Sequence, residues 1–140
     1  MAITQAMCTS FKEDLLNKEQ DLGNGADVIK IALYTSSATL DATTTAYTTT
    51  EEIAGSGYTA GGVTLTNQVV DTSGTTAYFD ADDPEWTSAS FTTAGALIYN
   101  STASNKAIAV LSFGGDFTVT SGTFRIVFPA PGAAAIVRID

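Results

Sequence analysis

The chain has 140 residues, which fits one domain, and it carries a formal net charge of −9. A nucleic-acid interface needs clustered cations, so we expect no direct nucleic-acid binding from the six scattered basic residues: Lys12, Lys18, Lys30, Lys106, Arg125 and Arg138. The absence of histidine excludes every catalytic triad and zinc site that uses this residue.

The composition favours a soluble protein built mainly of β-strands. Charged residues make up 15% of the chain, below the usual quarter, and threonine, serine and asparagine supply the polarity. These residues suit strands and turns better than helix interiors. No apolar run approaches the roughly 18 residues of a membrane span, and the chain does not open with a signal-peptide pattern. We therefore expect a protein made in the cytoplasm, with no membrane contact.

The N-terminal region, residues 1–22, contains the best helix candidate, predicted over residues 3–17. Thr4 is its predicted N-cap, and Asp14 is expected to face away from the core with its charged neighbours. The apolar stripe follows spacings of four residues: Ile3, Met7, Phe11 and Leu15, widened by Cys8 and Leu16. Two interpretations remain open: a helix that closes one end of a β-core, or an arm that docks on a neighbouring subunit.

Residues 28–140 predict a β-core of about eight strands with short connections. The predicted strands are Val28–Tyr34, Val63–Val70, Thr75–Phe79, Ser90–Tyr99, Lys106–Phe113, Phe117–Val119, Thr123–Phe128 and Ala134–Ile139. Turn signals separate them, including Ser73-Gly74, Gly114-Gly115 and Ser121-Gly122. We predict an all-β, antiparallel two-sheet sandwich of jelly-roll-like kind with a short N-terminal helix. Its core should include Ile31, Leu33, Leu65, Ile98, Val110, Leu111, Ile126 and Phe128.

The segment from Ser36 to Tyr58 is the one long irregular connection, and it contains the threonine-rich tract Thr43–Thr50. Connections of this length are usually functional or gain order on contact with a partner. The Gly-rich stretch that follows, with Gly55, Gly57, Gly61 and Gly62, lacks the Lys-Ser/Thr of a phosphate-binding loop. We expect these glycines to supply positive φ angles at a turn.

We expect no catalytic, cofactor-binding or metal site. Paired carboxylates for glycoside hydrolysis are conceivable at Glu51-Glu52 or in the acidic cluster Asp80–Glu85, but only Trp86 offers an aromatic sugar platform nearby. The order of residues in the acidic cluster lacks the alternating ligands and central glycine of an EF-hand loop. No serine pairs recognisably with Lys30 or Lys106, and Cys8 is expected to pack as a small hydrophobe.

The chain resembles a family of short virion-associated proteins of tailed bacteriophages. Four segments, which together cover most of the chain, carry this resemblance: AITQAMCTSFKEDLL, KIALYTSSATLDATTTAYTTTEEIAGSGYTAGG, ALIYNSTASNKAIAVLSFGGD and GTFRIVFPAPGAAAIVRI. The likeness is one of overall pattern and identifies no active site.

The resemblance implies a structural protein of the virion rather than an enzyme. For a small jelly-roll-like member it implies a capsid cement or decoration protein, located on the capsid exterior, with the major capsid protein as partner and a homo-oligomeric state. A tail, baseplate or fibre-associated role remains the alternative. Acidic charge fits the cement role, because it can complement basic patches on a shell.

Overall fold

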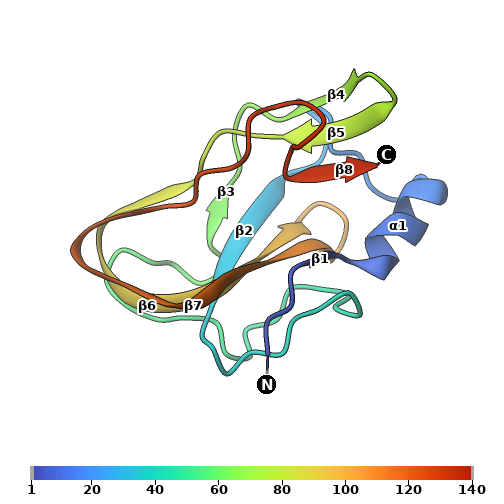
Figure 1. The fold of residues 1–140 in the computed structure, drawn as a ribbon. Coiled ribbons are helices and arrows are strands. Elements are labelled where there is room, and N and C mark those ends of the chain that lie inside the picture. The colour runs from blue at the N-terminus through green and yellow to red at the C-terminus, as the bar shows by residue number, and fades with distance from the viewer. Residues whose placement is uncertain (1, 140) are drawn as a thin grey trace.

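The structure, a computed structural model, describes residues 2–139 and contains two antiparallel sheets and one helix, α1 (Thr9–Leu16), within that range (Figure 1). The five-stranded sheet has the order β1 (Ala6–Met7), β7 (Lys106–Arg125), β6 (Glu85–Asn100), β2 (Ile29–Tyr34) and β3 (Val63–Thr64). The three-stranded sheet has the order β4 (Val69–Ser73), β5 (Thr76–Asp80) and β8 (Val137–Ile139).

The two sheets face each other, which confirms the predicted all-β, two-sheet sandwich. All named strand pairs are antiparallel. The jelly-roll detail is not confirmed, because the sheets have five and three strands and the long hairpin β6–β7 lies within one of them. The far ends of β6 and β7 curve towards the three-stranded sheet (Figure 1).

Both predicted turns inside β7 are wrong, because the chain forms bulges there and continues as one strand. Between the pairs Thr93–Phe117 and Gly95–Ser112, four residues of β7 oppose a single residue of β6, and Gly114 adopts φ +79°. A second bulge lies at Ser121, whose φ is +47° and whose N–H donates to Ser90 Oγ at 2.9 Å. Gly114 and Ser121 therefore lie at bulges within a strand instead of at turns. A bulge, like a turn, can require a positive φ angle, so the two look alike in the sequence.

The predicted strand Val63–Val70 is two strands, one in each sheet. Asn67 interrupts it with a φ of +53°, and the chain crosses from β3 to β4 at this point. The Gln68 side chain is buried and donates to the carbonyl oxygen of Leu22 at 3.1 Å, which fixes the crossing.

The N-terminal helix is shorter than predicted. Residues 3–8 are extended, and the N-cap of α1 is Cys8, with no side-chain capping bond, rather than Thr4. The N–H of Thr4 donates to the carbonyl oxygen of Leu40 instead. Asp14 is buried, which contradicts the expectation that it faces away from the core. The helix packs at one end of the sandwich through Phe11, as the first of the two interpretations requires.

One hydrophobic cluster lies between the sheets and reaches α1. Strands β2, β6 and β7 supply most of it, and all eight predicted core residues are buried: Ile31, Leu33, Leu65, Ile98, Val110, Leu111, Ile126 and Phe128. Burial of large apolar side chains of this kind contributes about 1.5–3 kcal/mol each, so this cluster dominates the stability of the fold.

Candidate functional site

The long connection between β2 and β3 is folded against the sandwich, and Glu52 is its hub. The two carboxylate oxygens of Glu52 accept hydrogen bonds from the Tyr47 hydroxyl at 2.7 Å, the Tyr58 hydroxyl at 2.6 Å and the Gly61 N–H at 2.7 Å. Bonds to an ionised acceptor are the strong ones. Glu52 therefore ties together the middle and the end of this connection.

Tyrosines join the connection to the five-stranded sheet. The Tyr58 hydroxyl accepts the N–H of Leu33 at 3.0 Å, and the Tyr34 hydroxyl donates to the carbonyl oxygen of Thr48 at 2.6 Å. Tyr47 stacks on Tyr99, with ring centroids 4.7 Å apart. Burial, followed by the hydrogen bond to Glu52, raises the pKa of Tyr58 far above its usual range. The hydroxyl therefore stays protonated and acts as a permanent donor.

The Gly-rich stretch packs tightly on the strands, and the predicted positive φ angles are confirmed at three of its four glycines but not at Gly55. Gly57, Gly61 and Gly62 all have positive φ. A Cβ on Gly62 would overlap the carbonyl oxygen of Ile31, and one on Gly55 would lie 2.5 Å from that of Ser90. The backbone of this stretch is therefore used in close packing against β2 and β6, where only glycine fits.

The N-terminal segment lies beside the long connection. The N–H of Thr4 donates to the carbonyl oxygen of Leu40 at 2.8 Å, and the N–H of Leu40 donates to that of Ala2 at 3.1 Å. The N–H of Thr9 donates to the carbonyl oxygen of Ala42 at 2.8 Å. The two segments meet on one side of the sandwich (Figure 1). We call the surface formed by residues 2–5 and 36–51 the loop surface.

The loop surface is hydroxyl-rich and slightly hollow. A depression of about 500 Å³ is lined by Ser37, Ala38, Thr39, Leu40, Thr48, Thr50 and Glu51. Thr43, Thr45, Thr49 and Thr50 are exposed. The Glu51 carboxylate accepts a hydrogen bond from the Thr35 hydroxyl at 2.9 Å. Glu51 and Glu52 therefore have different hydrogen-bond partners. This surface can form many hydrogen bonds with a partner, and Glu51 and Glu52 do not share a site as an acid–base pair would.

The carboxylates of the acidic cluster Asp80–Glu85 make separate contacts with different parts of the fold. Asp82 accepts hydrogen bonds from Asn67 and Thr66, and Asp83 accepts the N–H of Phe128 at 2.8 Å. Glu85 forms an ion pair with Arg125 at 2.9 Å. Among residues 2–139, no three His, Cys, Asp or Glu side chains lie close enough together to hold a metal ion.

Asp80, the first residue of this cluster, and Trp86, which directly follows the cluster, are buried. Burial, opposed by a hydrogen bond from the Ala81 N–H and reinforced by Asp83 and Asp82, raises the pKa of Asp80. Trp86 is 3% exposed and packs between Tyr58 and Phe124, with ring centroids 6.3 and 5.9 Å away. Trp86 is therefore a core residue and offers no open platform for a sugar.

The remaining sequence candidates also have structural roles. Cys8 is fully buried, as predicted, and burial followed by the Asp41 carboxylate raises the pKa of its thiol to about 11. Lys106 lies 3.5 Å from Asp14 and 3.8 Å from Glu19. Because those carboxylates hold the ammonium group, Lys106 is not placed as a base for a serine.

Sequence reasoning missed a buried polar network at the end of β6. The Asn100 side chain donates to Gln20 Oε1 at 3.2 Å and to Asp27 Oδ2 at 2.8 Å, and Gln20 donates to Asp14 at 2.9 Å. The network joins the hairpin to the segment that follows α1. No local sequence pattern predicts it, because residues that bond directly in it, Gln20 and Asn100, are 80 positions apart in the chain.

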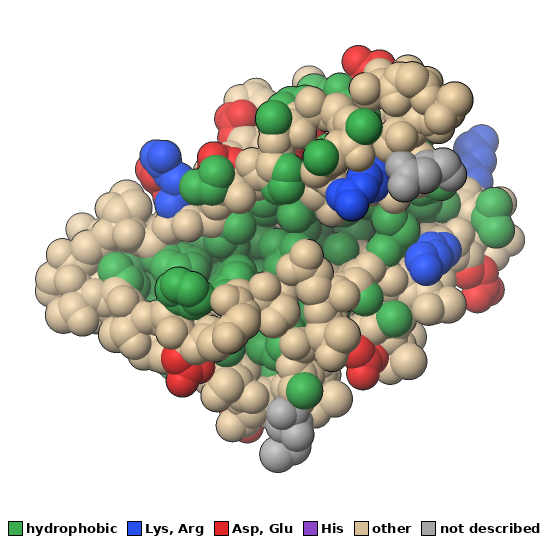
Figure 2. All heavy atoms as spheres, in the orientation of Figure 1, with side chains coloured by type: hydrophobic (Ala, Val, Ile, Leu, Met, Phe, Trp, Pro, Cys, Tyr) green, Lys and Arg blue, Asp and Glu red, His purple; other side chains and the backbone are tan. Residues whose placement is uncertain are grey.

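Exposed charge is mostly acidic. The exposed cations are Lys12, Lys18, Arg125 and Arg138. The exposed carboxylates are more numerous: Glu13, Glu19, Asp21, Glu51, Asp71, Asp82, Asp83, Glu85 and Asp116. On the face shown in Figure 2, acidic side chains lie around the margin. Such a surface favours encounter with basic partners.

Comparisons of this chain with protein-family models, with curated proteins and with solved structures give no match. The α-helix within residues 2–139 is too short to cross a membrane.

Proposed function

We propose that this protein is a structural component of a tailed-bacteriophage particle and binds the outside of the major capsid shell as a cement or decoration protein. The observation that carries the proposal is the loop surface. Two segments distant in the sequence, the N-terminal segment and the threonine-rich connection, form one surface on a folded β-sandwich.

The construction of the loop surface suits repeated docking on a lattice. Its backbone is already held by Glu52 and the tyrosines, so binding does not have to order a long flexible loop. Pre-organisation of this kind reduces the entropy lost on association. Many identical contacts on a shell then reinforce one another when copies are linked, which agrees with the homo-oligomeric state implied by the resemblance.

The acidic surface supports the same role. Exposed carboxylates steer the protein towards basic patches and raise the rate of encounter more than the affinity. The partner in this proposal is the major capsid protein, and the protein acts without catalysis or a cofactor. Its location is the exterior of the virion.

A reconstitution experiment tests the proposal. Expanded shells that lack the protein are mixed with increasing amounts of purified protein, and the bound amount is measured after sedimentation. We expect saturable binding. Thr50→Trp fills the hollow of the loop surface and should weaken binding about tenfold or more, because bulk at the centre of an interface disrupts packing.

Thr72→Trp is the matched control, because Thr72 is also exposed but lies on β4, outside the loop surface. It should bind like the unchanged protein. Equal binding by both variants would remove the loop surface from the proposal. Failure of the unchanged protein to bind shells, together with its recovery only in tail fractions of native particles, would overturn the cement role in favour of the tail alternative.

A further inference from the structure

The two sheets leave a groove between their edge strands. β1 is the end strand of the five-stranded sheet and β8 is the end strand of the three-stranded sheet. Both line one hollow of about 360 Å³, whose walls are Gln5–Met7, Ala109–Leu111 and Ile136–Arg138. Figure 2 shows hydrophobic side chains gathered in a hollow that runs between the two layers. We call this feature the edge groove.

On the β8 side of the edge groove, backbone groups are available for strand pairing. The N–H of Cys8 donates to the carbonyl oxygen of Ile108 at 2.9 Å, and the N–H of Thr9 donates to that of Ala42 at 2.8 Å, so the N-terminal segment has β7 on one side and residues 40–42 on the other. β8 pairs with β5 on one side, and within residues 2–139 no strand pairs with its other side. An unpaired edge of this kind is a template for another strand.

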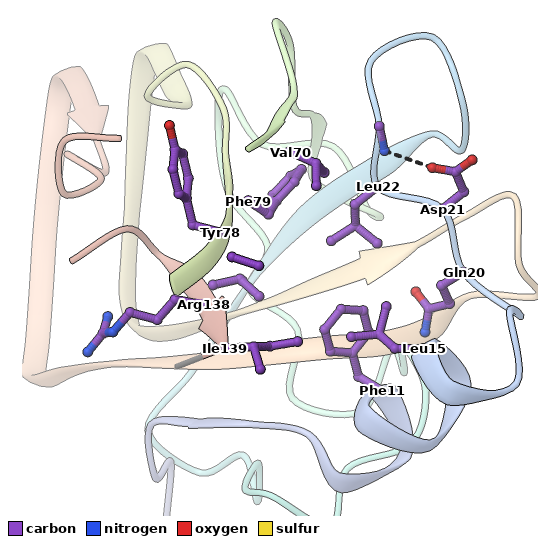
Figure 3. Close-up of a pocket in the computed structure, with 13 residues that line it drawn as sticks. Phe11, Leu15, Gln20, Asp21, Leu22, Val70, Tyr78, Phe79, Arg138 and Ile139 are labelled. Atoms are coloured by element: carbon purple, nitrogen blue, oxygen red, sulfur yellow. Dashed lines mark hydrogen bonds between the residues drawn. The ribbon is translucent and has the colours of Figure 1, made fainter. Parts of the chain in front are cut away.

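An apolar slot continues the edge groove along β8. This slot of about 270 Å³ shares Val137 and Arg138 with the edge groove. In Figure 3, Phe11 and Leu15 of α1 point towards Ile139 of β8. Ile139 is 52% exposed, so the slot is open to solvent. Its size suits one or two apolar side chains of a bound strand.

The charge of the edge groove differs from that of the rest of the surface. Arg138 is the only charged residue among those lining the hollow, and no carboxylate accompanies it there. Its guanidinium donates to the carbonyl oxygen of Ala135 at 2.9 Å and points away from the apolar slot (Figure 3). The ion pairs found within residues 2–139 do not include Arg138. A ligand bound in the edge groove could therefore place a carboxylate next to the Arg138 guanidinium.

We infer that the edge groove binds an extended strand of another protein, inserted beside β8 by backbone hydrogen bonding. The strand has apolar side chains at alternate positions, which enter the slot, and a carboxylate on its other face, which meets Arg138. This mode of recognition takes affinity from the backbone and specificity from alternate side chains. The inference is independent of the role on a capsid.

A second copy of this chain fits the edge groove less well than another protein does. The unpaired edge that a second copy could offer is its own β8, which carries Arg138 and no carboxylate, so it would bring two cations together in the groove.

A peptide titration followed by amide chemical shifts in NMR tests this inference. The probe is the terminally blocked heptapeptide Thr-Val-Thr-Val-Glu-Val-Thr. We expect it to shift the amide signals of Met7 and of residues 137–139. The same peptide with Lys in place of Glu should bind about threefold or more weakly, because it loses a charge-assisted contact with Arg138. A version with Pro at the central Val should not bind, since it lacks the ladder N–H.

Two variants complete the experiment. Arg138→Gln should abolish the preference for Glu over Lys, whereas Arg125→Gln, which removes an exposed cation outside the edge groove, should preserve it. The inference is overturned if the probe does not bind at millimolar concentration, if its shifts map away from β1 and β8, if the Pro peptide binds equally well, or if Arg138→Gln keeps the preference.

Discussion

At the scale of single residues, Asp80 is the clearest case of a group that costs stability. Its side chain is 6% exposed, and its Oδ1 has no hydrogen-bond partner among residues 2–139. Burial, together with Asp83 and Asp82, raises its pKa above the ordinary value of 3.8. A buried acceptor without a partner costs about 1–3 kcal/mol, so this position works against folding at neutral pH.

We predict that Asp80→Asn stabilises the protein at pH 7. A carboxyl whose pKa is raised by folding is favourable below its unfolded pKa and loses that contribution as pH rises through the folded pKa. The variant should therefore melt about 2–4 °C higher at pH 7 and lose this advantage near pH 3.8, as thermal unfolding across that range can measure. A variant that is less stable at pH 7 would show that the Asp80 charge has a partner.

Glu52 has the opposite role. We predict that Glu52→Ala lowers the free energy of unfolding by about 2–4 kcal/mol, because two tyrosine hydroxyls and the Gly61 N–H lose their acceptor. Glu52→Gln should cost less, since its single carbonyl oxygen still accepts. Denaturant unfolding of both variants measures the difference. An equal cost for the two would mean that charge, rather than the set of hydrogen bonds, holds the connection in place.

The sequence predicts the core residues well and the Glu52 hub poorly, for a physical reason. Ile31, Leu33 and Ile98 lie in locally apolar stretches of β2 and β6, where residues on both faces of the sheet are buried. Glu52 lies in no such stretch, and its role depends on Tyr58 and Gly61 folding back onto it. The sequence shows a Glu-Glu pair with tyrosines on either side, but it does not show which groups the Glu52 carboxylate binds.

At the scale of elements, the hairpin β6–β7 forms the centre of the larger sheet. We predict that Leu111→Ala, on β7, lowers the free energy of unfolding by about 2–5 kcal/mol, because the side chain is buried and its loss leaves a cavity. Leu16→Ala is the control, because Leu16 is 90% exposed at the end of α1. Denaturant unfolding should separate the two clearly; similar small effects would place Leu111 outside the core.

The sequence predicts that strands are present better than it predicts where each strand begins and ends. Gly114 and Ser121 resemble turn positions in the sequence, yet each lies in a bulge because β6 continues beside β7 as a template. The same holds for the N-terminal segment: the apolar spacing around Ile3 and Met7 suits a helix, but pairing with Leu40 and with β7 keeps the segment extended. Tertiary pairing overrides local preference in both cases.

At the scale of the whole molecule, the protein combines a β-sandwich, an acidic exterior and a pre-formed loop surface, and we propose one role for the three together. Composition alone predicted the β-class and the acidic character. The meeting of residues 2–5 with residues 36–51 could not be predicted, because hydrogen bonds between segments more than 30 residues apart leave no local pattern. The pairing of these two segments forms the surface that we propose to contact the shell.

The most direct test of the cement role is the temperature at which phage particles release their DNA, measured by dye binding for particles with and without this protein. Packaged DNA presses outward on the shell, and a cement bridges shell contacts against that pressure. We predict that particles lacking the protein assemble but release DNA at a lower temperature, and that added purified protein restores the higher one. Release at the same temperature in both kinds of particle, with no effect of added protein, would contradict the account.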